Sequence, residues 1–296
     1  MDLLTTDRLI IEPLTTNDNT FIHELVNTKG WLEFIGSRNV NSEAEATAYI
    51  QKIVDNSDVN YWVVRIRENV MPVGIITFIK RSYLSHHDIG AAFLPAYTNC
   101  GYAYEATQAV LHNVIHAGEH SHILSITSPN NHSAIKLLKK LGLQFDKKIE
   151  VENEKLKVYS ASTDKLMINE ITNSFFEVFN TKNKRQPKLN LLKNICITEI
   201  IIISKTAVTH TVYDLDLFIE TRKMKLTDGT LTEFDEKETY EETRIIDNMA
   251  QRYSAYEKSG ILTGKTFKQQ GYKLFQFIKT DQFWKIASLI WEDKEN

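Results

Sequence analysis

Hydrophobic positions in the first half of the chain follow two patterns that alternate. Short apolar runs predict β-strands at residues 8–14, 61–67, 73–81, 88–94 and 122–128. Apolar residues at helical spacing predict α-helices at residues 15–28, 42–54, 102–118 and 131–142. A further strand is expected at residues 155–160. Because strands and helices alternate, residues 1–164 are expected to form a mixed α/β domain.

The pattern changes at the polar stretch 160–165, which predicts a joint between two domains. One helix is expected to begin near residue 166, and the rest of the chain predicts long strands, including 208–226 and 244–258. Hairpin turns are expected at Asp228-Gly229 and at Asp281-Gln282. Residues 165–296 therefore predict an α+β domain, with one helix across a curved antiparallel sheet.

Composition and charge exclude several classes of protein. The chain has 296 residues, more than one core usually serves, and its net charge of −3 gives no basic field for nucleic acid. The most apolar run, 195–204, is too short to span a bilayer and contains Glu199. The N-terminus has no signal-peptide pattern, so a cytoplasmic protein without a membrane partner is expected. The two cysteines, Cys100 and Cys196, indicate neither a disulfide framework nor a metal site.

The turn between the strand at 88–94 and the helix at 102–118 predicts a phosphate site. The first N–H groups of a helix have no partner within it and carry the positive end of its dipole. Gly101 and the small Ala103 allow close approach, and Asn99 suits a positive φ. The alternative is a short strand-to-helix connection without a ligand.

A second polar turn follows the strand at 122–128. Asn130 and Asn131 stand where two parallel strands would diverge, before a helix that ends at Gly142. Asn131 is therefore a candidate to donate to a ligand amide or a bridging water. Its alternative is the N-cap of the following helix.

Five segments carry a family resemblance, and they occur in a fixed order: TDRLIIEPL, WLEFIGSRNV with SEAEATAYI, VGIITFIKR, DIGAAFLPAYTNCGYAYEA and ITSPNNHSAIKLLKKLGL. Through them, residues 1–160 resemble the GNAT superfamily of acyl-CoA-dependent N-acetyltransferases, in particular its RimJ-like branch. The resemblance implies acetyl-CoA as donor and a primary amine as acceptor, either a small molecule or a peptide.

The resemblance also implies where the donor binds. It places the pantetheine beside Phe93 and Leu94, and the pyrophosphate on the turn formed by Thr98, Asn99, Cys100, Gly101, Tyr102 and Ala103. The family usually has a basic residue where Cys100 stands, so weaker acetyl-CoA binding is expected. In the last helix, Ala134 replaces a frequent serine, and Leu138 replaces a tyrosine that many members use as general acid.

Amide formation needs a neutral amine, so a proton acceptor is expected beside the thioester. Asp88, His86 and His87 are the candidates, and Asn131 is a further polar group. The alternative is that His86 and His87 form a polar loop entry and that Asp88 is a solvated strand end. Trp31, Phe34 and Arg38 are candidates for the acceptor pocket, where Arg38 could bind a carboxylate. Their alternative function is packing, with Arg38 in a structural ion pair.

The second half resembles the nuclear-transport-factor-2-like or SnoaL-like superfamily over residues 167–293. The segments AQRYSAYEKSG, GYKLFQFIKT and WKIASLIWEDKE carry this resemblance. It implies a cone-like fold with an apolar pocket and a homodimer formed through the sheet.

The sequence is therefore compatible with three functions. The first is an N-acetyltransferase with an appended pocket or dimerisation domain. The second is an acyl-CoA- or small-molecule-binding protein with a degenerate transferase half, motivated by Thr98, Cys100, Ala134 and Leu138. The third is an isomerase or hydrolase in the second half, which would need a buried acid–base pair there.

Overall fold

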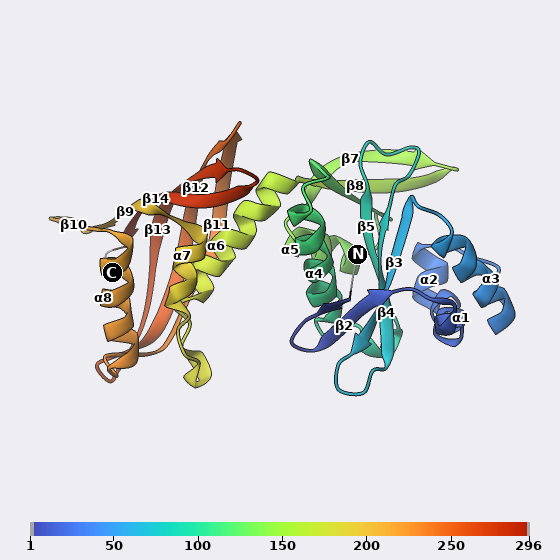
Figure 1. Ribbon diagram of the computed structural model, residues 1–296, viewed down its shortest axis with the longest axis horizontal. Coiled ribbons are helices and arrows are strands. Elements are labelled where there is room, and N and C mark those ends of the chain that lie inside the picture. Colours follow the sequence, from blue (N-terminus) through green and yellow to red (C-terminus); the bar gives the residue numbers. More distant parts are fainter. Residues whose placement is uncertain (1–2, 295–296) are drawn as a thin grey trace. The chain divides into compact units, whose positions relative to one another are not determined.

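The computed structural model describes residues 3–294 of the chain (Figure 1). The chain folds into two compact units, Met1–Thr163 and Asp164–Asn296. No helix within residues 3–294 is both long enough and apolar enough to cross a membrane.

The N-terminal unit is built on an eight-stranded sheet with the order β1-β2-β3-β4-β5-β6-β8-β7. Its strands are β1 (Leu4–Thr5), β2 (Leu9–Pro13), β3 (Val59–Ile66), β4 (Pro72–Ile79), β5 (Asp88–Phe93), β6 (His122–Thr127), β7 (Gln144–Val151) and β8 (Glu154–Ser162). Neighbouring strands are antiparallel except β5 and β6, which are parallel.

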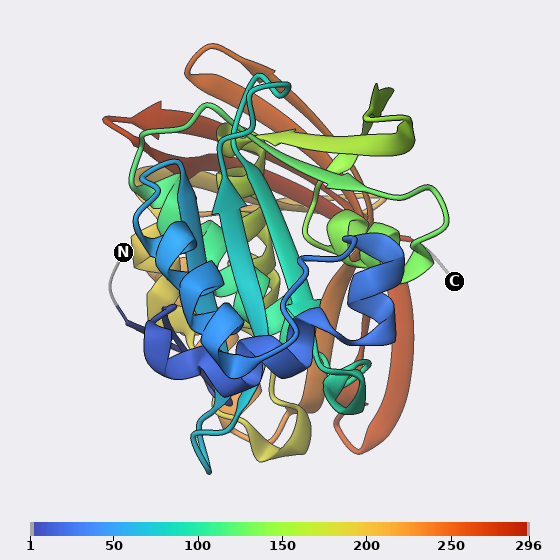
Figure 2. The same cartoon turned by 90° about the vertical axis from the view of Figure 1, so that its right-hand side faces the viewer.

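Helices cover both faces of this sheet (Figure 2). One group consists of α1 (Asn19–Val26), α2 (Lys29–Phe34) and α3 (Glu43–Val54), and the other of α4 (Tyr102–His116) and α5 (His132–Lys140). Helix α3 begins after Ser42, whose hydroxyl accepts a 3.2 Å hydrogen bond from the amide of Glu45. The predicted strands and helices of this unit are thus confirmed, with ends within a few residues of those expected.

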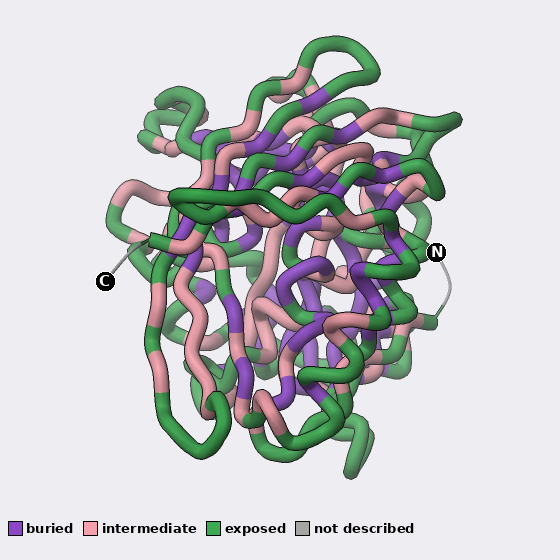
Figure 3. The backbone as a smooth tube through the Cα atoms, turned by 90° about the vertical axis from the view of Figure 1, so that its left-hand side faces the viewer, coloured by how far each residue is buried: buried purple, intermediate pink, exposed green. Residues whose placement is uncertain are grey.

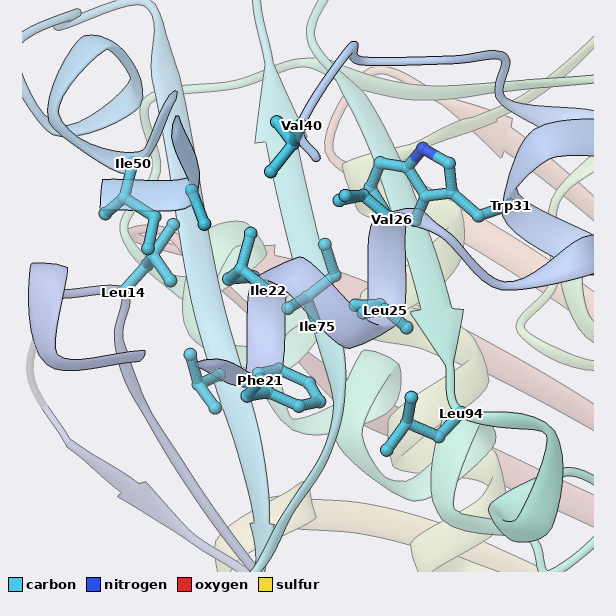
Figure 4. Close-up of a cluster of buried hydrophobic side chains, with 12 residues drawn as sticks. Leu14, Phe21, Ile22, Leu25, Val26, Trp31, Val40, Ile50, Ile75 and Leu94 are labelled. Atoms are coloured by element: carbon cyan, nitrogen blue, oxygen red, sulfur yellow. The ribbon is translucent and has the colours of Figure 1, made fainter. Parts of the chain in front are cut away.

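The core under α1 and α3 is shown in Figure 4. Its buried side chains come from the helices, from the following loop and from the sheet: Leu14, Phe21, Ile22, Leu25, Val26, Trp31, Val40, Ala46, Ile50, Val63, Ile75 and Leu94. Burial of this apolar surface fixes α1 and α3 on one face of the sheet, which leaves the loop between α2 and α3 above the middle strands.

Three elements of this unit have no counterpart in the sequence prediction: β1, α2 and β7. Strand β7 pairs only with β8 at the edge of the sheet, and most of its residues are exposed. An edge strand without a buried face shows no alternation of apolar and polar residues, so periodicity does not detect it.

The parallel pair β5–β6 is joined at one register position, Asp88 with Leu124. The amide of Leu124 donates to the carbonyl of His87 over 3.0 Å at the same place. Beyond this point β5 and β6 are not paired within residues 3–294, whereas the other edge of β6 pairs along its length with β8. The side of β5 that faces β6 is therefore open from Gly90 to Phe93.

The C-terminal unit has a six-stranded sheet with the order β10-β9-β14-β13-β12-β11. Its strands are β9 (Cys196–Lys205), β10 (His210–Tyr213), β11 (Leu231–Ile246), β12 (Met249–Leu262), β13 (Lys265–Thr280) and β14 (Phe283–Asp293). The helices are α6 (Thr163–Glu177), α7 (Leu192–Ile195) and α8 (Leu215–Thr227). Buried and exposed positions alternate along β12 and β13, as Figure 3 shows for the strands of this unit.

Several expectations for this unit are wrong. Residues 215–227 form helix α8 rather than strand, because the Asp214 side chain accepts a 2.8 Å hydrogen bond from the amide of Leu217 and caps a helix. Asp228-Gly229 consequently joins a helix to β11, not two strands. Residues 244–258 contain the turn between β11 and β12. The sheet is also not wholly antiparallel, since β9 and β14 are parallel. The turn at Asp281-Gln282 is confirmed.

Candidate active site

The predicted phosphate turn lies between β5 and α4. A short 3₁₀ turn, Pro95–Tyr97, follows β5, and α4 starts after Gly101. Asn99 has a φ of 60° and Gly101 a φ of 82°, both in the left-handed region. Among non-glycine residues, asparagine is one of the types most often found in this left-handed region. The two left-handed residues fold the backbone tightly against the helix start.

The helix start presents unpaired amides. Within residues 3–294, the N–H groups of Gly101, Tyr102 and Ala103 donate to no protein acceptor, as expected for the first turn of a helix. The amide of Thr98, by contrast, donates to the carbonyl of Pro95 over 3.3 Å. Because the free amides coincide with the positive end of the α4 dipole, this turn can hold an anion such as a phosphate.

The second polar turn has a capping function. The side-chain oxygen of Asn131 accepts a 3.0 Å hydrogen bond from the amide of Ala134, which makes Asn131 the N-cap of α5. This is the alternative expected from the sequence, and it commits one side-chain atom of Asn131 to the helix. Leu138, in the same helix, is buried, so it packs in the core and offers no proton.

Phe93 and Leu94, expected beside the pantetheine, have different surroundings. The Phe93 ring lies over Gly74, where an added Cβ would come within 2.4 Å of it. The Leu94 side chain is buried in the core under α1, and its amide donates to the carbonyl of Val73 over 2.9 Å. Backbone groups at this end of β5, rather than the Leu94 side chain, are therefore what a ligand can reach.

Asp88 and His87 point to opposite faces of the sheet, as neighbours on a strand do. The Asp88 side chain is 3% exposed and its Oδ1 accepts a 2.7 Å hydrogen bond from Arg81 Nε. Burial raises the pKa of Asp88, although the Arg81 guanidinium works in the other direction.

His87 lies in a group of aromatic rings. Its ring stacks on Phe78 with 4.8 Å between centroids and lies 4.6 Å from the ring of His120. Burial, and then the neighbouring His120, lower the pKa of His87, which favours the neutral ring. A neutral imidazole can accept a proton, but His87 lies on the face of the sheet opposite to Asp88 and Gly90.

The three residues expected in the acceptor pocket differ in their exposure to solvent. Trp31 is buried in the core, and its Nε1 donates to the carbonyl of Gly36 over 3.1 Å. Phe34 is half-buried at the end of α2. Arg38 is exposed, and its guanidinium donates to the carbonyl of Ile35 over 3.3 Å and lies 5.9 Å from the Trp31 ring. Arg38 is thus the one of the three that is accessible to a charged ligand.

A row of hydroxyl groups near β5 was not anticipated from the sequence. Tyr61 and Gly90 both pair with Thr77, so the three positions share one face of the sheet. A Cβ at Gly90 would lie 2.6 Å from the Thr77 hydroxyl oxygen, which shows that this oxygen leans over the glycine. Burial and then the neighbouring Tyr49 raise the pKa of Tyr61, so its phenol keeps its proton. Strand sequences alone do not show which hydroxyls fall in register.

The C-terminal unit contains buried charged pairs. Lys273 Nζ donates to Glu236 over 2.8 Å, both side chains are nearly inaccessible, and Lys273 also lies 3.8 Å from the centroid of the Tyr256 ring. Arg252 is likewise buried and bonds to Glu238 and to Asn169. Burial lowers the pKa of Lys273. Buried acid–base pairs therefore exist in this unit, although the sequence pattern did not reveal them.

A family model agrees with the geometry of the N-terminal unit. The model of the acetyltransferase (GNAT) domain matches residues 8–144, which include β5, the turn at Asn99–Gly101 and α5. The N-terminal half of the chain is a GNAT acetyltransferase domain. An uncharacterized N-acetyltransferase of Bacillus subtilis (strain 168), YnaD, is 29% identical over 157 residues, which cover 51% of this chain and 90% of that protein.

Solved structures are similar to the same half of the chain. An acetyltransferase of the GNAT family from Bacillus anthracis has 23% identity and a TM-score of 0.48, with 55% of this chain and 99% of that chain covered. Spermidine N-acetyltransferase from Vibrio cholerae, in complex with CoA and spermine, has 17% identity and a TM-score of 0.48, with 54% and 99% covered. Because GNAT enzymes use acetyl-CoA, the free amides of the α4 start lie in a domain whose family binds a pyrophosphate-containing donor.

Proposed function

We propose that the GNAT domain transfers an acetyl group from acetyl-CoA to a primary amine, of either a small molecule or a peptide. The observation that carries this proposal is the left-handed turn at Asn99–Gly101, which presents the free amides of α4 at the end of a strand whose edge is open. An open strand edge continued by an anion site suits a long donor with a phosphate group.

The amides of Gly101 to Ala103 are proposed to bind the pyrophosphate. The open side of β5, from Gly90 to Phe93, is proposed to hydrogen-bond to the pantetheine amides as a neighbouring strand would. Thr98, Asn99 and Cys100 form the exposed rim of this site. Within the family, we propose the RimJ-like branch, because the five sequence segments quoted above resemble it.

The acceptor is proposed to approach the face of β5 that carries Gly90. The amine nitrogen forms a bond to the thioester carbon, the carbon–sulfur bond breaks, and the ammonium proton must be removed. Asp88 is proposed as the proton acceptor, because it lies on the same face as Gly90 and its raised pKa suits proton exchange. Tyr61 is proposed to return a proton to the thiolate, in place of the tyrosine missing at Leu138.

Calorimetry with acetyl-CoA tests the proposal directly. Binding at micromolar to millimolar concentration is expected, followed by acetylation of at least one amine in a library of small amines and peptide N-termini. No binding at millimolar acetyl-CoA would contradict the proposal. Binding without acetylation of any amine would favour instead an acyl-CoA-binding protein with a degenerate catalytic centre.

For the C-terminal unit we propose a nuclear-transport-factor-2-like, cone-like fold that forms a homodimer through the outer face of its sheet. This face carries exposed apolar side chains on neighbouring strands: Ile201, Tyr272, Leu274 and Ile290. A hollow of about 510 Å³ lies on the same unit and is lined in part by Leu274 and Ile290. Exposed apolar patches of this kind mark interaction surfaces.

A further inference from the structure

Arg8, at the start of β2, lies against the phosphate turn although it is far from it in sequence. Its Nε donates to Glu105 Oε2 over 2.7 Å, and its Nη2 lies 2.6 Å from the same oxygen. Its Nη1 donates to the carbonyl of Cys100 over 3.0 Å. The guanidinium carbon lies 4.6 Å from the centroid of the Tyr102 ring. The side chain thus contacts the turn and the first turn of α4 together.

Glu105 fixes this arrangement. Its Oε1 accepts hydrogen bonds from the Thr6 hydroxyl over 2.6 Å and from the Arg8 amide over 3.1 Å. Partial burial opposes ionisation of Glu105, but the bonds from Thr6 and Arg8 outweigh it and lower its pKa. The carboxylate therefore stays charged and holds the guanidinium in one orientation.

The guanidinium also sets the orientation of the turn. Because the peptide bond is planar and trans, the N–H of Gly101 points away from the carbonyl of Cys100, which Arg8 holds. A Cβ on Gly101 would come within 3.2 Å of Arg8 Nη2, so the edge of the guanidinium lies beside the glycine. The side chain of Arg8 remains 48% exposed and accessible to a ligand on the turn.

Arg8 belongs to the segment TDRL and Glu105 to the segment YAYEA, and neither residue takes part in the proposed reaction. We propose that Arg8 is the cationic residue of the phosphate site, compensating for the missing basic side chain at Cys100, with Glu105 as its positioning residue. The inference rests on the proposed acetyl-CoA site. A phosphate on the turn meets one guanidinium in addition to the amides of α4, and the contact with the Cys100 carbonyl keeps the amide of Gly101 turned outward.

Binding of coenzyme A and of pantetheine, which lacks the phosphates, separates this function from a purely structural one. Calorimetry on the full chain is expected to show that Arg8→Gln weakens coenzyme A about five- to tenfold, as for one partly exposed charge-assisted contact, and leaves pantetheine unchanged. Raising the salt concentration is expected to weaken coenzyme A less in Arg8→Gln than in the wild type. Arg67→Gln, which removes an exposed arginine of the same unit, serves as the matched control and is expected to bind both probes normally.

Two further variants keep the inference testable if Arg8→Gln is poorly folded. Arg8→Lys keeps the charge and is expected to weaken coenzyme A only about twofold. Arg8→Gln combined with Cys100→Lys is expected to recover most of the lost affinity. Equal weakening of coenzyme A and pantetheine, or wild-type affinity in folded Arg8→Gln, would overturn the inference. Failure of the wild type to bind coenzyme A would instead overturn the proposed function on which it rests.

Discussion

Asp88 and Arg81 form an ion pair at the one position where β5 and β6 are joined. The 2.7 Å hydrogen bond from Arg81 Nε leaves the second carboxylate oxygen of Asp88 without a side-chain donor among residues 3–294. Burial nevertheless raises the pKa of Asp88. The open edge of β5 begins at Gly90, so Asp88 lies at the closed end of the proposed donor site.

The first prediction concerns this carboxyl group. Asp88→Asn is expected to lower kcat about 100-fold, the usual contribution of a positioned base, without changing KM for acetyl-CoA. The measurement is a steady-state assay with the amine found in the library screen. His87→Asn, directly before β5 and on the opposite face of the sheet from Asp88, is the control and is expected to change kcat by less than about threefold. Near-normal activity of Asp88→Asn would make the ion pair structural only.

The second prediction is that Asp88 and Glu105 change the stability of the fold with pH in opposite directions. The pKa of Asp88 is raised in the folded state, so its stabilisation is present at acid pH and is lost as pH rises through that pKa. The pKa of Glu105 is lowered, so its stabilisation is present above the unfolded-state pKa and is lost as pH falls through the folded one.

Urea unfolding between about pH 3.5 and 7 measures the pH dependence of the unfolding free energy. Hydrogen exchange of the β4 and β5 amides reports the unfolding of this unit. The stability difference between wild type and Glu105→Gln should be largest near neutral pH and shrink in acid. The difference between wild type and Asp88→Asn should change in the opposite direction. Two parallel pH profiles would contradict the assignment of these environments.

The third prediction tests the backbone of the phosphate turn. Asn99 has a φ of 60°, which glycine adopts freely and which a β-branched residue adopts at a cost of about 1–2 kcal/mol. Asn99→Gly should therefore bind coenzyme A within about twofold of wild type, and Asn99→Val should bind it about fivefold or more weakly. Calorimetry measures both. Equal affinities of the two variants would show that the turn does not need this conformation for binding.

The fourth prediction concerns the buried pair in the C-terminal unit. Lys273→Met leaves the Glu236 carboxylate without its 2.8 Å partner and is expected to cost about 3–5 kcal/mol of unfolding free energy. The double variant Lys273→Met/Glu236→Leu removes both charges and is expected to recover most of that loss. Thermal and urea unfolding give the comparison. A double variant as unstable as the single one would mean that the pair itself, rather than the unpaired charge, determines stability.

The fifth prediction tests the outer sheet face as a dimer interface. Leu274 is 51% exposed and pairs in register with Ile290, which is 39% exposed. Leu274→Glu places a charge at the centre of this apolar face and is expected to convert a dimer into a monomer in analytical ultracentrifugation. Leu262→Glu, at the exposed end of β12, is the matched control and should leave the dimer intact. A monomeric wild type would contradict the interface.

Most elements of the N-terminal unit and the location of the phosphate turn could be predicted from the sequence alone. Alternating apolar runs and helical spacing are local signals, and each was strong because one face of the element is buried. The residue types at Asn99 and Gly101 likewise indicated left-handed backbone before any contact was known. Helix α8 was missed although its buried residues Leu215, Phe218, Ile219 and Leu226 have helical spacing. Two exposed apolar residues, Leu217 and Met224, lie off that face and obscure the pattern.

Which side chains meet depends instead on how distant segments pack. Arg8 and Glu105 are 97 positions apart, and no periodicity predicts that β2 brings one to the other. Tyr61 and Thr77 share a face with Gly90 only through the register of three strands. Trp31, on α2, belongs to the core rather than to a pocket because its side chain packs with buried residues of α1 and of the sheet. Local pattern reflects backbone preference and burial, whereas a site requires strand register and helix placement, which are fixed only when the whole unit has folded.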